Sequence, residues 1–396
     1  MSQRLISRSP DLQRLRDDGY DIEVRAGHLL VKDVPYVNER REIKRGVLVS
    51  TLRLANDSTD RPDTHVVHWA GEFPCSKDGV RLTPQLEHAS GESNLGDGIV
   101  VQHSFSNKFK DRDYIDYYEK MTRYVAIISH PARAIDPSVT AQTHPITEGG
   151  EEDDSVFHYT DNATSRAGIG LFTRRLRGRR IAIVGIGGSG AYVLDFVAKT
   201  PVAEIHLFDG DELSQHNAFR SPGAASGADL GRKPNKAQYF AEHYSRMRRH
   251  ITAHPEYVGE SNIAELRDMD FVFVCIDKGE ARRLIVARLD EFGVPFIDVG
   301  MGLYMADEGL GGLARVTTST PDRREPLRSG QRIPFSGDED HNEYSRNIQI
   351  AELNALNAAL AVIKWKKWCG FYVDLEHELH SIYVINGNLV VNEDQS

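Results

Sequence analysis

Residues 180–190 read RIAIVGIGGSG, and this stretch decides the expected fold. Its first part, residues 180–184, is mostly apolar and β-branched, which is typical of a parallel strand buried on both faces. The glycines that follow are Gly185, Gly187, Gly188 and Gly190, and a helical stretch at 191–199 comes next. A glycine loop between a buried strand and a helix lets backbone N–H groups approach a phosphate. The stretch therefore predicts a nucleotide-binding turn, and a tight turn without a ligand is the alternative.

The chain after this loop alternates between strands and helices. The expected order is strand 204–208, helix 236–249, strand 271–276, helix 279–292 and strand 295–299. A long helix at 348–365 and antiparallel strands from residue 370 follow. Alternation at this spacing indicates βαβ units, and so a Rossmann-like, doubly wound α/β sheet.

Residues 1–145 follow a different pattern. Short runs rich in Val, Ile and Thr, separated by turn-forming clusters, predict strands at 46–54, 65–69, 98–105 and 124–129. One helix is expected at 112–122. We therefore expect a strand-rich α+β accessory domain at 1–145, an acidic linker at 146–160 and the α/β domain at 161–396.

The composition excludes several classes of protein. Hydrophobic residues make up 40% and charged residues 27% of 396 residues, which fits a globular protein of about two domains. No apolar run is long enough for a transmembrane helix, and the start lacks the apolar segment of a secretory signal. The net charge of −10 argues against bulk nucleic-acid binding. Three scattered cysteines do not suggest disulfides, so the cytoplasm is the expected location.

An acidic residue closes the second strand of the α/β domain. Asp209 follows the run EIHLF, 24 residues after Gly185. A carboxylate at this place can accept a hydrogen bond from a ribose hydroxyl. Up to this point an NAD(P)-dependent dehydrogenase fits as well as an ATP-binding protein.

The segments after Asp209 separate these two possibilities. They read LFDGDELSQHNAFRSPG at 207–223, GRKPNK at 231–236 and FVFVCIDKGEARR at 271–283. Over about residues 160–320 the chain resembles the ubiquitin-activating-enzyme superfamily, the ThiF/MoeB/HesA adenylyltransferases. These proteins combine a glycine loop, a strand ending in D-x-D, an S-N-x-x-R element, a G-x-x-K motif and a C-x-D motif. The resemblance implies the fold of their adenylation domain.

The resemblance also implies which residues bind the nucleotide. Gly188 would lie against the phosphates, and Asp209 would hold the ribose. Asp211 is the second acid of D-x-D. Asn217 matches the asparagine of S-N-x-x-R, although His216 makes the wording of that element unusual.

Three further matches would carry the chemistry. Arg220, Lys236 and Asp277 match the arginine and the lysine of these motifs and the aspartate that helps hold Mg²⁺. Acyl adenylation brings a carboxylate to the α-phosphorus while pyrophosphate leaves, and cations offset both anions. A dehydrogenase needs none of these groups and is the less favoured alternative, with a non-catalytic nucleotide-binding scaffold as another. Arg166 matches an arginine that reaches the partner's site in homodimeric relatives.

The resemblance further implies a substrate and partners. The cofactors would be ATP and Mg²⁺, and the substrate the C-terminal carboxylate of a ubiquitin-like or sulfur-carrier protein. A conjugating enzyme is a candidate partner, because similar fusions resemble components of bacterial ubiquitin-like conjugation and anti-phage systems. No nucleic acid or membrane partner is expected. We expect a homodimer, with the apolar helix at 348–365 in its interface.

The cysteines leave the transfer step open. Thioester-forming relatives carry a cysteine in a crossover loop, but residues 303–345 contain none, so adenylation is expected to need no thiol. Cys75, expected in a polar turn, and Cys369, beside lysines that would lower its pKa if the thiol is exposed, are the candidate thiols. Cys275 is expected to be a buried core residue. The CxxC zinc pairs of relatives are absent, so no structural zinc of that kind is expected.

Overall fold

The computed structural model describes residues 2–55, 58–145, 155–159, 161, 163–164, 167, 169–324, 332–335 and 349–392. The chain divides into two compact units. Unit 1 comprises 1–154 and 159–168, and unit 2 comprises 155–158 and 169–396. Within unit 2, the N–H of Arg249 donates to the carbonyl of Val156 at 2.7 Å. This bond ties the short 155–158 segment to the body of unit 2.

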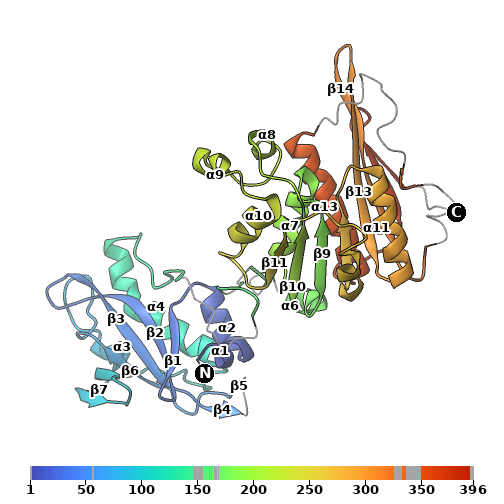
Figure 1. Cartoon of the computed structure of the whole chain (residues 1–396). Coiled ribbons are helices and arrows are strands. Elements are labelled where there is room, and N and C mark those ends of the chain that lie inside the picture. Colours follow the sequence, from blue (N-terminus) through green and yellow to red (C-terminus); the bar gives the residue numbers. More distant parts are fainter. Residues whose placement is uncertain are drawn as a thin grey trace. The chain divides into compact units, whose positions relative to one another are not determined.

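Unit 1 is built on a six-stranded antiparallel sheet with the order β1-β2-β3-β6-β8-β7 (Figure 1). The strands are β1 (Ile22–Arg25), β2 (His28–Val37), β3 (Ile43–Thr51), β6 (Val66–Ala70), β7 (Glu87–Asn94) and β8 (Val100–Ser106). A separate pair consists of β4 (Leu54–Ala55) and β5 (Ser58–Thr59). The helices are α1 (Ser2–Arg8), α2 (Pro10–Asp17), α3 (Thr83–Leu86) and α4 (Tyr117–Ile135).

Helix α4 corrects the prediction of a helix at 112–122 followed by a strand at 124–129. The structure has one continuous helix, which Asp116 caps by accepting a hydrogen bond from the N–H of Glu119 at 2.7 Å. Its buried residues include Tyr117, Met121, Tyr124, Val125, Ile128 and Ala132. This spacing of three and four residues is helical, and it outweighs the strand preference of the Val and Ile content.

Unit 2 contains an eight-stranded sheet with the order β11-β10-β9-β12-β13-β14-β15-β16. Strands β11 to β13 in this order are parallel, and β14 to β16 are antiparallel to their neighbours. The strands are β9 (Arg180–Val184), β10 (Glu204–Phe208), β11 (Ile251–His254), β12 (Phe271–Val274), β13 (Phe296–Ala306), β14 (Gly309–Ser319), β15 (His380–Val384) and β16 (Leu389–Asn392). The chain thus has the predicted fold class, a Rossmann-like α/β sheet preceded by a strand-rich α+β region.

The helices of unit 2 follow the predicted alternation. They are α6 (Gly170–Thr173), α7 (Gly188–Ala198), α8 (Gln215–Ala218), α9 (Gly227–Gly231), α10 (Lys236–Tyr244), α11 (Gly279–Phe292) and α13 (Ala351–Trp368), with 3₁₀ turns η1 (Arg174–Leu176) and η2 (Ile263–Asp268). No helix in the described ranges combines the length and hydropathy needed to cross a bilayer.

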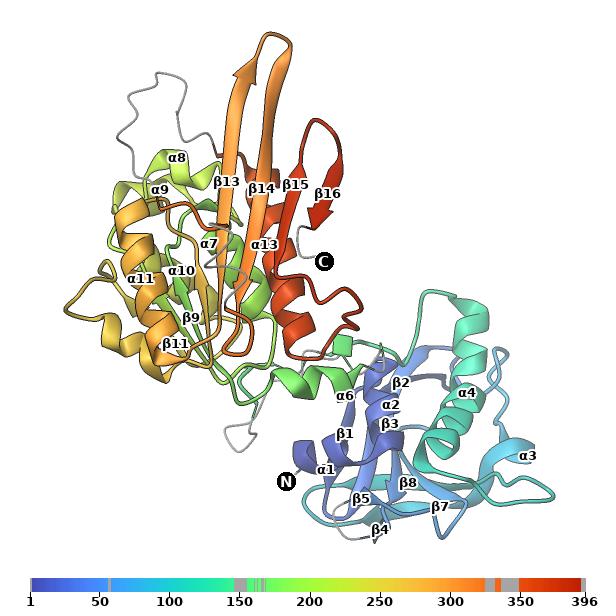
Figure 2. The same ribbon diagram turned by 90° about the vertical axis from the view of Figure 1, so that its right-hand side faces the viewer.

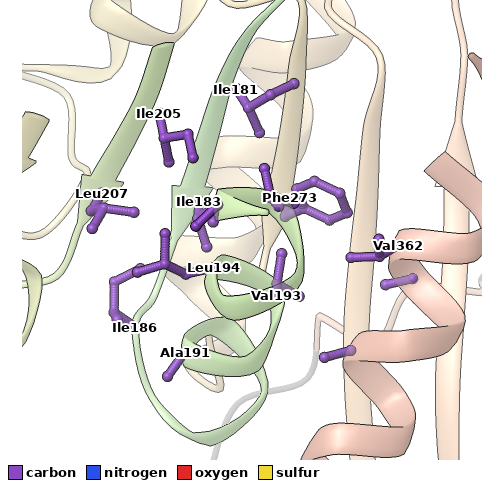
Figure 3. Close-up of a cluster of buried hydrophobic side chains, with 14 of the residues drawn as sticks. Ile181, Ile183, Ile186, Ala191, Val193, Leu194, Ile205, Leu207, Phe273 and Val362 are labelled. Carbon is purple, nitrogen blue, oxygen red and sulfur yellow. The ribbon is translucent and has the colours of Figure 1, made fainter. Parts of the chain in front are cut away.

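Alternate side chains of β9 enter two separate cores, because successive residues of a strand point to opposite faces. Ile181 and Ile183 pack with α7 and α13, as Figure 3 shows for Leu194 and Val362. Ala182 and Val184 belong to the other core, with Ile285 and Leu289 of α11. The sheet is therefore covered on both faces, as its wholly apolar strands predict.

Helix α13 does not have the role that we predicted for it. Ala358, Ala361 and Trp365 are buried in the core of unit 2, where α13 packs against α7, β13 and β14. The apolar face therefore covers the sheet of its own unit, so its apolar pattern does not by itself point to a dimer interface. Strands β13 and β14 continue past the sheet as a hairpin, which carries exposed Tyr304 and Met305 (Figure 2).

Candidate nucleotide-binding site

The candidate site lies at the carboxyl ends of the parallel strands of unit 2. From β9 the chain proceeds to β10 and β11 on one side and later to β12 and β13 on the other. Ligands of open α/β sheets bind at such a reversal of strand order. A cavity of about 810 Å³ opens here, lined by Gly185 after β9, Asp209 after β10 and Asp277 after β12.

The glycine loop is shaped by close contacts with its surroundings. Gly185 has φ +88°, and a side-chain carbon there would lie 2.7 Å from the carbonyl oxygen of Cys275. A carbon on Gly190 would lie 1.9 Å from the carbonyl oxygen of Gly185. Both positions therefore require glycine. Gly187 and Gly188 line the cavity at the start of α7, where backbone N–H groups and the helix dipole favour an anion.

Asp209 holds this loop against the end of β10. One carboxylate oxygen accepts a hydrogen bond from the N–H of Ile186 at 2.6 Å, and the other accepts one from Asp211 at 2.8 Å. Burial raises the pKa of Asp209, and the charge of Lys236 opposes that rise. Each carboxylate oxygen keeps a further lone pair for an external donor such as a ribose hydroxyl.

Lys236 and Asp211 form an ion pair in the wall of the cavity. The two charged atoms are 2.6 Å apart, and the N–H of Lys236 donates to the carbonyl of Asp211 at 2.9 Å. Burial would raise the pKa of Asp211, but hydrogen bonds from Lys236 and Tyr257 lower it. The same bond raises the pKa of Tyr257 to about 12. Asp211 is therefore an anion that holds both partners at the cavity.

Arg220 and Asp277 complete the charged half of the cavity. Burial lowers the pKa of Arg220, and the charges of Asp277 and Asp211 oppose this effect. The Nε of Arg220 is buried without a hydrogen-bond partner in the described part of the chain. An orphaned guanidinium donor in the same cavity wall as Lys236 suits an anionic ligand such as a polyphosphate. Carboxylate oxygens of the kind that Asp277 supplies are the ligands that Mg²⁺ prefers.

Not every predicted site residue lies in the cavity wall. Gly190 packs against Gly185 instead of facing the cavity. Asn217 is buried outside the wall, and its side-chain oxygen accepts a hydrogen bond from the N–H of Ser214 at 2.9 Å, which caps α8. Arg166 lies outside the described residues.

The structure shows no activated thiol among the three cysteines. Cys75 has no exposed surface, which corrects our expectation of a polar turn, and its thiol donates to the carbonyl of Phe73 at 3.3 Å. Burial raises the pKa of Cys75. Cys369 is buried, so the condition of an exposed thiol is not met, and burial raises its pKa to about 11 despite nearby cations. Cys275 touches the cavity, but burial raises its pKa as well.

A buried ionic network on the β13 side of the cavity was missed by the sequence analysis. Asp298, with no exposed surface, lies 3.2 Å from Nε of Arg282 and 2.5 Å from a terminal nitrogen of Arg315. Arg315 also donates to Thr317 at 2.6 Å. Both arginines line the cavity, so two guanidinium groups face one carboxylate. Arg282 lies in the run GEARR after C-x-D, whereas Arg315 reaches the cavity because β14 pairs with β13.

Asn354 of α13 is a second residue that the sequence did not reveal. It is fully buried, its side-chain oxygen accepts a hydrogen bond from the hydroxyl of Ser189 at 2.9 Å, and its amide lies 3.4 Å from the carbonyl of Arg220. Asn354 thereby connects the glycine loop to the Arg220 segment. No local motif marks it, since its partners are far away in the sequence.

Fold and cavity together are those of a Rossmann-like α/β domain with a glycine loop at its cavity, which follows a strand-rich domain. Residues 159–341 match the ThiF family model, and residues 10–162 match a domain of unknown function (DUF6791). The chain therefore carries a ThiF family domain at 159–341.

Known proteins resemble this domain over part of their length. Ubiquitin-like modifier-activating enzyme 5 of Drosophila virilis is 27% identical over 150 residues, which are 35% of this chain and 38% of that protein. The tRNA threonylcarbamoyladenosine dehydratase of Haemophilus influenzae is 27% identical over 156 residues, 37% of this chain and 59% of that protein. The chain thus spans less than two thirds of either relative.

Solved structures that superpose on part of this chain include PaaA and E. coli MccB. PaaA gives a TM-score of 0.46 at 16% identity, covering 69% of this chain and 84% of PaaA. MccB gives a TM-score of 0.46 at 14% identity, covering 78% of this chain and 93% of MccB.

Proposed function

We propose that unit 2 catalyses the ATP-dependent adenylation of a protein carboxylate. One observation carries this proposal, namely that a single cavity brings the glycine loop together with Asp209, Arg220, Lys236 and Asp277. Hydride transfer to a nicotinamide does not call for two cations and a metal-type carboxylate around the phosphates. The ThiF family match and the similarity to a ubiquitin-like modifier-activating enzyme support the same reaction.

The residues of the chain divide the work between binding and charge stabilisation. The N–H groups at Gly187 and Gly188 would bind phosphate oxygens, and Asp209 would accept a ribose hydroxyl. Arg220 and Lys236 would neutralise phosphate oxygens, so that a carboxylate can approach without charge repulsion. In the reaction a bond forms between a carboxylate oxygen and the α-phosphorus. The bond from this phosphorus to the bridging oxygen breaks, and its electron pair leaves with pyrophosphate.

Asp277 is the residue that we propose for metal binding. It is exposed directly after β12 and lines the cavity near Arg220. A bound Mg²⁺ would supply positive charge for the leaving pyrophosphate. The ion pair of Asp211 with Lys236 holds that lysine in the cavity wall, where it would meet the same phosphates. The chain therefore positions its charges before any substrate carboxylate arrives.

We further propose a ubiquitin-like or sulfur-carrier protein as the substrate, in a bacterial ubiquitin-like conjugation or anti-phage system of the cytoplasm. The similarity to an enzyme that activates a ubiquitin-like modifier supports the substrate class. A conjugating enzyme would then receive the product, since the structure offers no activated thiol. A homodimer with Arg166 acting in the partner's cavity is part of the same proposal.

ATP–pyrophosphate exchange tests the reaction. The full chain is incubated with ATP, Mg²⁺, labelled pyrophosphate and a ubiquitin-like protein with a free C-terminus. We expect exchange that disappears when the partner's C-terminal carboxylate is amidated. ATP binding without exchange would instead favour a scaffold, and NAD(P)-dependent absorbance change would favour a dehydrogenase.

A further inference from the structure

A second polar cluster lies on β10 and β11, outside the lining of the cavity. Nδ1 of His206 lies 3.1 Å from Nε2 of His254, and Nε2 of His206 lies 3.1 Å from a carboxylate oxygen of Glu204. At the other end, Nδ1 of His254 lies 3.0 Å from a carboxylate oxygen of Glu265. Three short contacts thus connect Glu204, His206, His254 and Glu265 in a row.

The two histidines of this row carry too few N–H groups to place a hydrogen in each of its three contacts. A neutral imidazole carries one N–H, so His206 and His254 together supply two donors. Ionised carboxylates only accept, so the two hydrogen bonds of the row, from His206 to Glu204 and from His254 to His206, use both N–H groups. Nδ1 of His254 is then an acceptor that lies 3.0 Å from a carboxylate oxygen of Glu265, which also only accepts. A cation at this contact, either a proton or a metal ion, would relieve the repulsion between the two acceptors.

The surrounding charges show at which end that cation is missing. Glu204 already has a cationic partner, because Nε of Arg180 lies 3.0 Å from its carboxylate. At the other end, Glu256 adds a second carboxylate, and the ligand atoms of His254, Glu256 and Glu265 lie within 4.8 Å of one another. In the described part of the chain neither of these glutamates has a lysine or arginine ion-pair partner. Negative charge therefore accumulates around Nδ1 of His254.

We propose that His254, Glu256 and Glu265 bind a divalent transition-metal ion, for which Zn²⁺ is the natural probe. Nδ1 of His254 and one oxygen from each glutamate would be the protein ligands, in the N/O donor set that Zn²⁺ accepts, with water completing the shell. Every hydrogen then has a place: Nε2–H of His254 donates to His206, and Nε2–H of His206 donates to Glu204. A metal-bound histidine ordinarily makes such a bond through its second nitrogen.

The site would fasten three segments beside the nucleotide cavity. His254 ends β11, Glu256 lies in the following loop, and Glu265 belongs to η2. The ring of His254 stacks on Phe208, and its carbonyl accepts the N–H of Asp209 at 3.2 Å. An ion here would therefore order the loop that carries Tyr257 to Asp211. The site itself does not depend on the proposed adenylation.

Zinc titration calorimetry on the full chain tests this site. The protein is treated with EDTA, desalted and titrated with Zn²⁺ in excess Mg²⁺, which competes for the oxygen-rich groups of the cavity. The decisive variants are Glu256→Gln and Glu265→Gln, since both side chains are exposed and the fold should survive. Glu260→Gln is the matched control, because Glu260 lies in the same loop and pairs with Arg288 at 3.5 Å.

We expect the wild-type chain and Glu260→Gln to bind one zinc ion each. Glu256→Gln and Glu265→Gln should bind zinc at least about 10-fold more weakly. His206→Asn should weaken binding by about 10- to 100-fold, the usual effect of losing a partner of a metal-bound histidine. Equal affinity and stoichiometry in all these proteins, or no zinc binding by the wild type, would overturn the proposal. The additional cation of the row would then be a proton. Because the readout is metal binding, failure here leaves pyrophosphate exchange untouched.

Discussion

The two units each bury a lysine, and the comparison shows how different the surroundings of two buried charges can be. In unit 1, Lys120 of α4 has no exposed surface, and its ammonium donates to the hydroxyl of Ser50 at 2.9 Å and the carbonyl of Thr64 at 2.8 Å. In unit 2, Lys236 is 6% exposed but pairs with Asp211 in a cavity wall. Burial is therefore common to both lysines, and the proposed role of Lys236 rests on its ionised partner and its place in a cavity wall.

The largest effect should come from the charged groups of unit 2. Lys236→Ala and Asp277→Ala should each slow pyrophosphate exchange by roughly 10²- to 10³-fold, because each removes a preorganised charge stabiliser. The melting temperature should change little, since Asp277 is exposed and Asp211 can be solvated. Lys199→Ala serves as control, because Lys199 pairs with Asp195 on the exposed end of α7. Near-normal exchange in Asp277→Ala would remove the metal assignment.

In unit 1 the corresponding substitution should affect stability instead. Lys120→Ala leaves the acceptors at Ser50 and Thr64 without a donor and creates a cavity, which should lower the free energy of unfolding by about 2–5 kcal/mol. Lys120→Met keeps most of the volume and should cost less. Urea denaturation measures both variants. Loss of exchange in Lys120→Met at unchanged stability would break the comparison, because it would give the lysine of unit 1 a functional role.

The burial of Lys120 should also make the stability of unit 1 depend on pH. Desolvation lowers the pKa of Lys120 from 10.5 to about 8. Between these values the unfolded chain binds more protons than the folded chain, so stability rises with pH across this window. The gain is at most about 3.5 kcal/mol, at about 1.4 kcal/mol per pKa unit, and Lys120→Met should lack it. Urea denaturation at pH 8 and pH 10 gives the free energy of unfolding of both proteins. The same change in this free energy between the two pH values in both proteins would contradict this account.

The smallest effect should come from replacing the cysteines. Unit 1 buries Cys75, and Cys275 lies in the cavity wall of unit 2. Exchange should persist when Cys75, Cys275 and Cys369 are all replaced by alanine, because no step of adenylation uses a thiol. Lost packing should lower the melting temperature slightly. Exchange that fails in Cys75→Ala alone, with folding intact by circular dichroism, would place thiol chemistry in unit 1.

The sequence predicted best those features that depend on short stretches of chain. The bounds of β9, β10 and α11 were correct, because each is marked by a local apolar pattern. The positions of Asp209 and Asp277 at one edge followed as well, since parallel strands end at the same side of a sheet. The roles suggested for these residues remain predictions.

Features that depend on distant contacts were not predictable in this way. Strand β13 runs to Ala306 instead of ending near residue 299, because β14 pairs with its whole length. Arg315 reaches the cavity through that same pairing. Helix α13 has a long apolar face, but the pattern does not say whether that face covers its own sheet or another molecule. Only the tertiary structure decides between these two uses.

The hydrogen bond between Ser189 and Asn354 joins residues that are 165 positions apart. Its consequence concerns the time at which the site is completed during protein synthesis. Unit 1 lies within the first 168 residues, so it can fold while the rest of the chain is still being made. A nascent chain that stops before residue 351 contains the whole glycine loop but lacks α13. The ribosome must therefore add nearly the whole of unit 2 before the loop gains its final support.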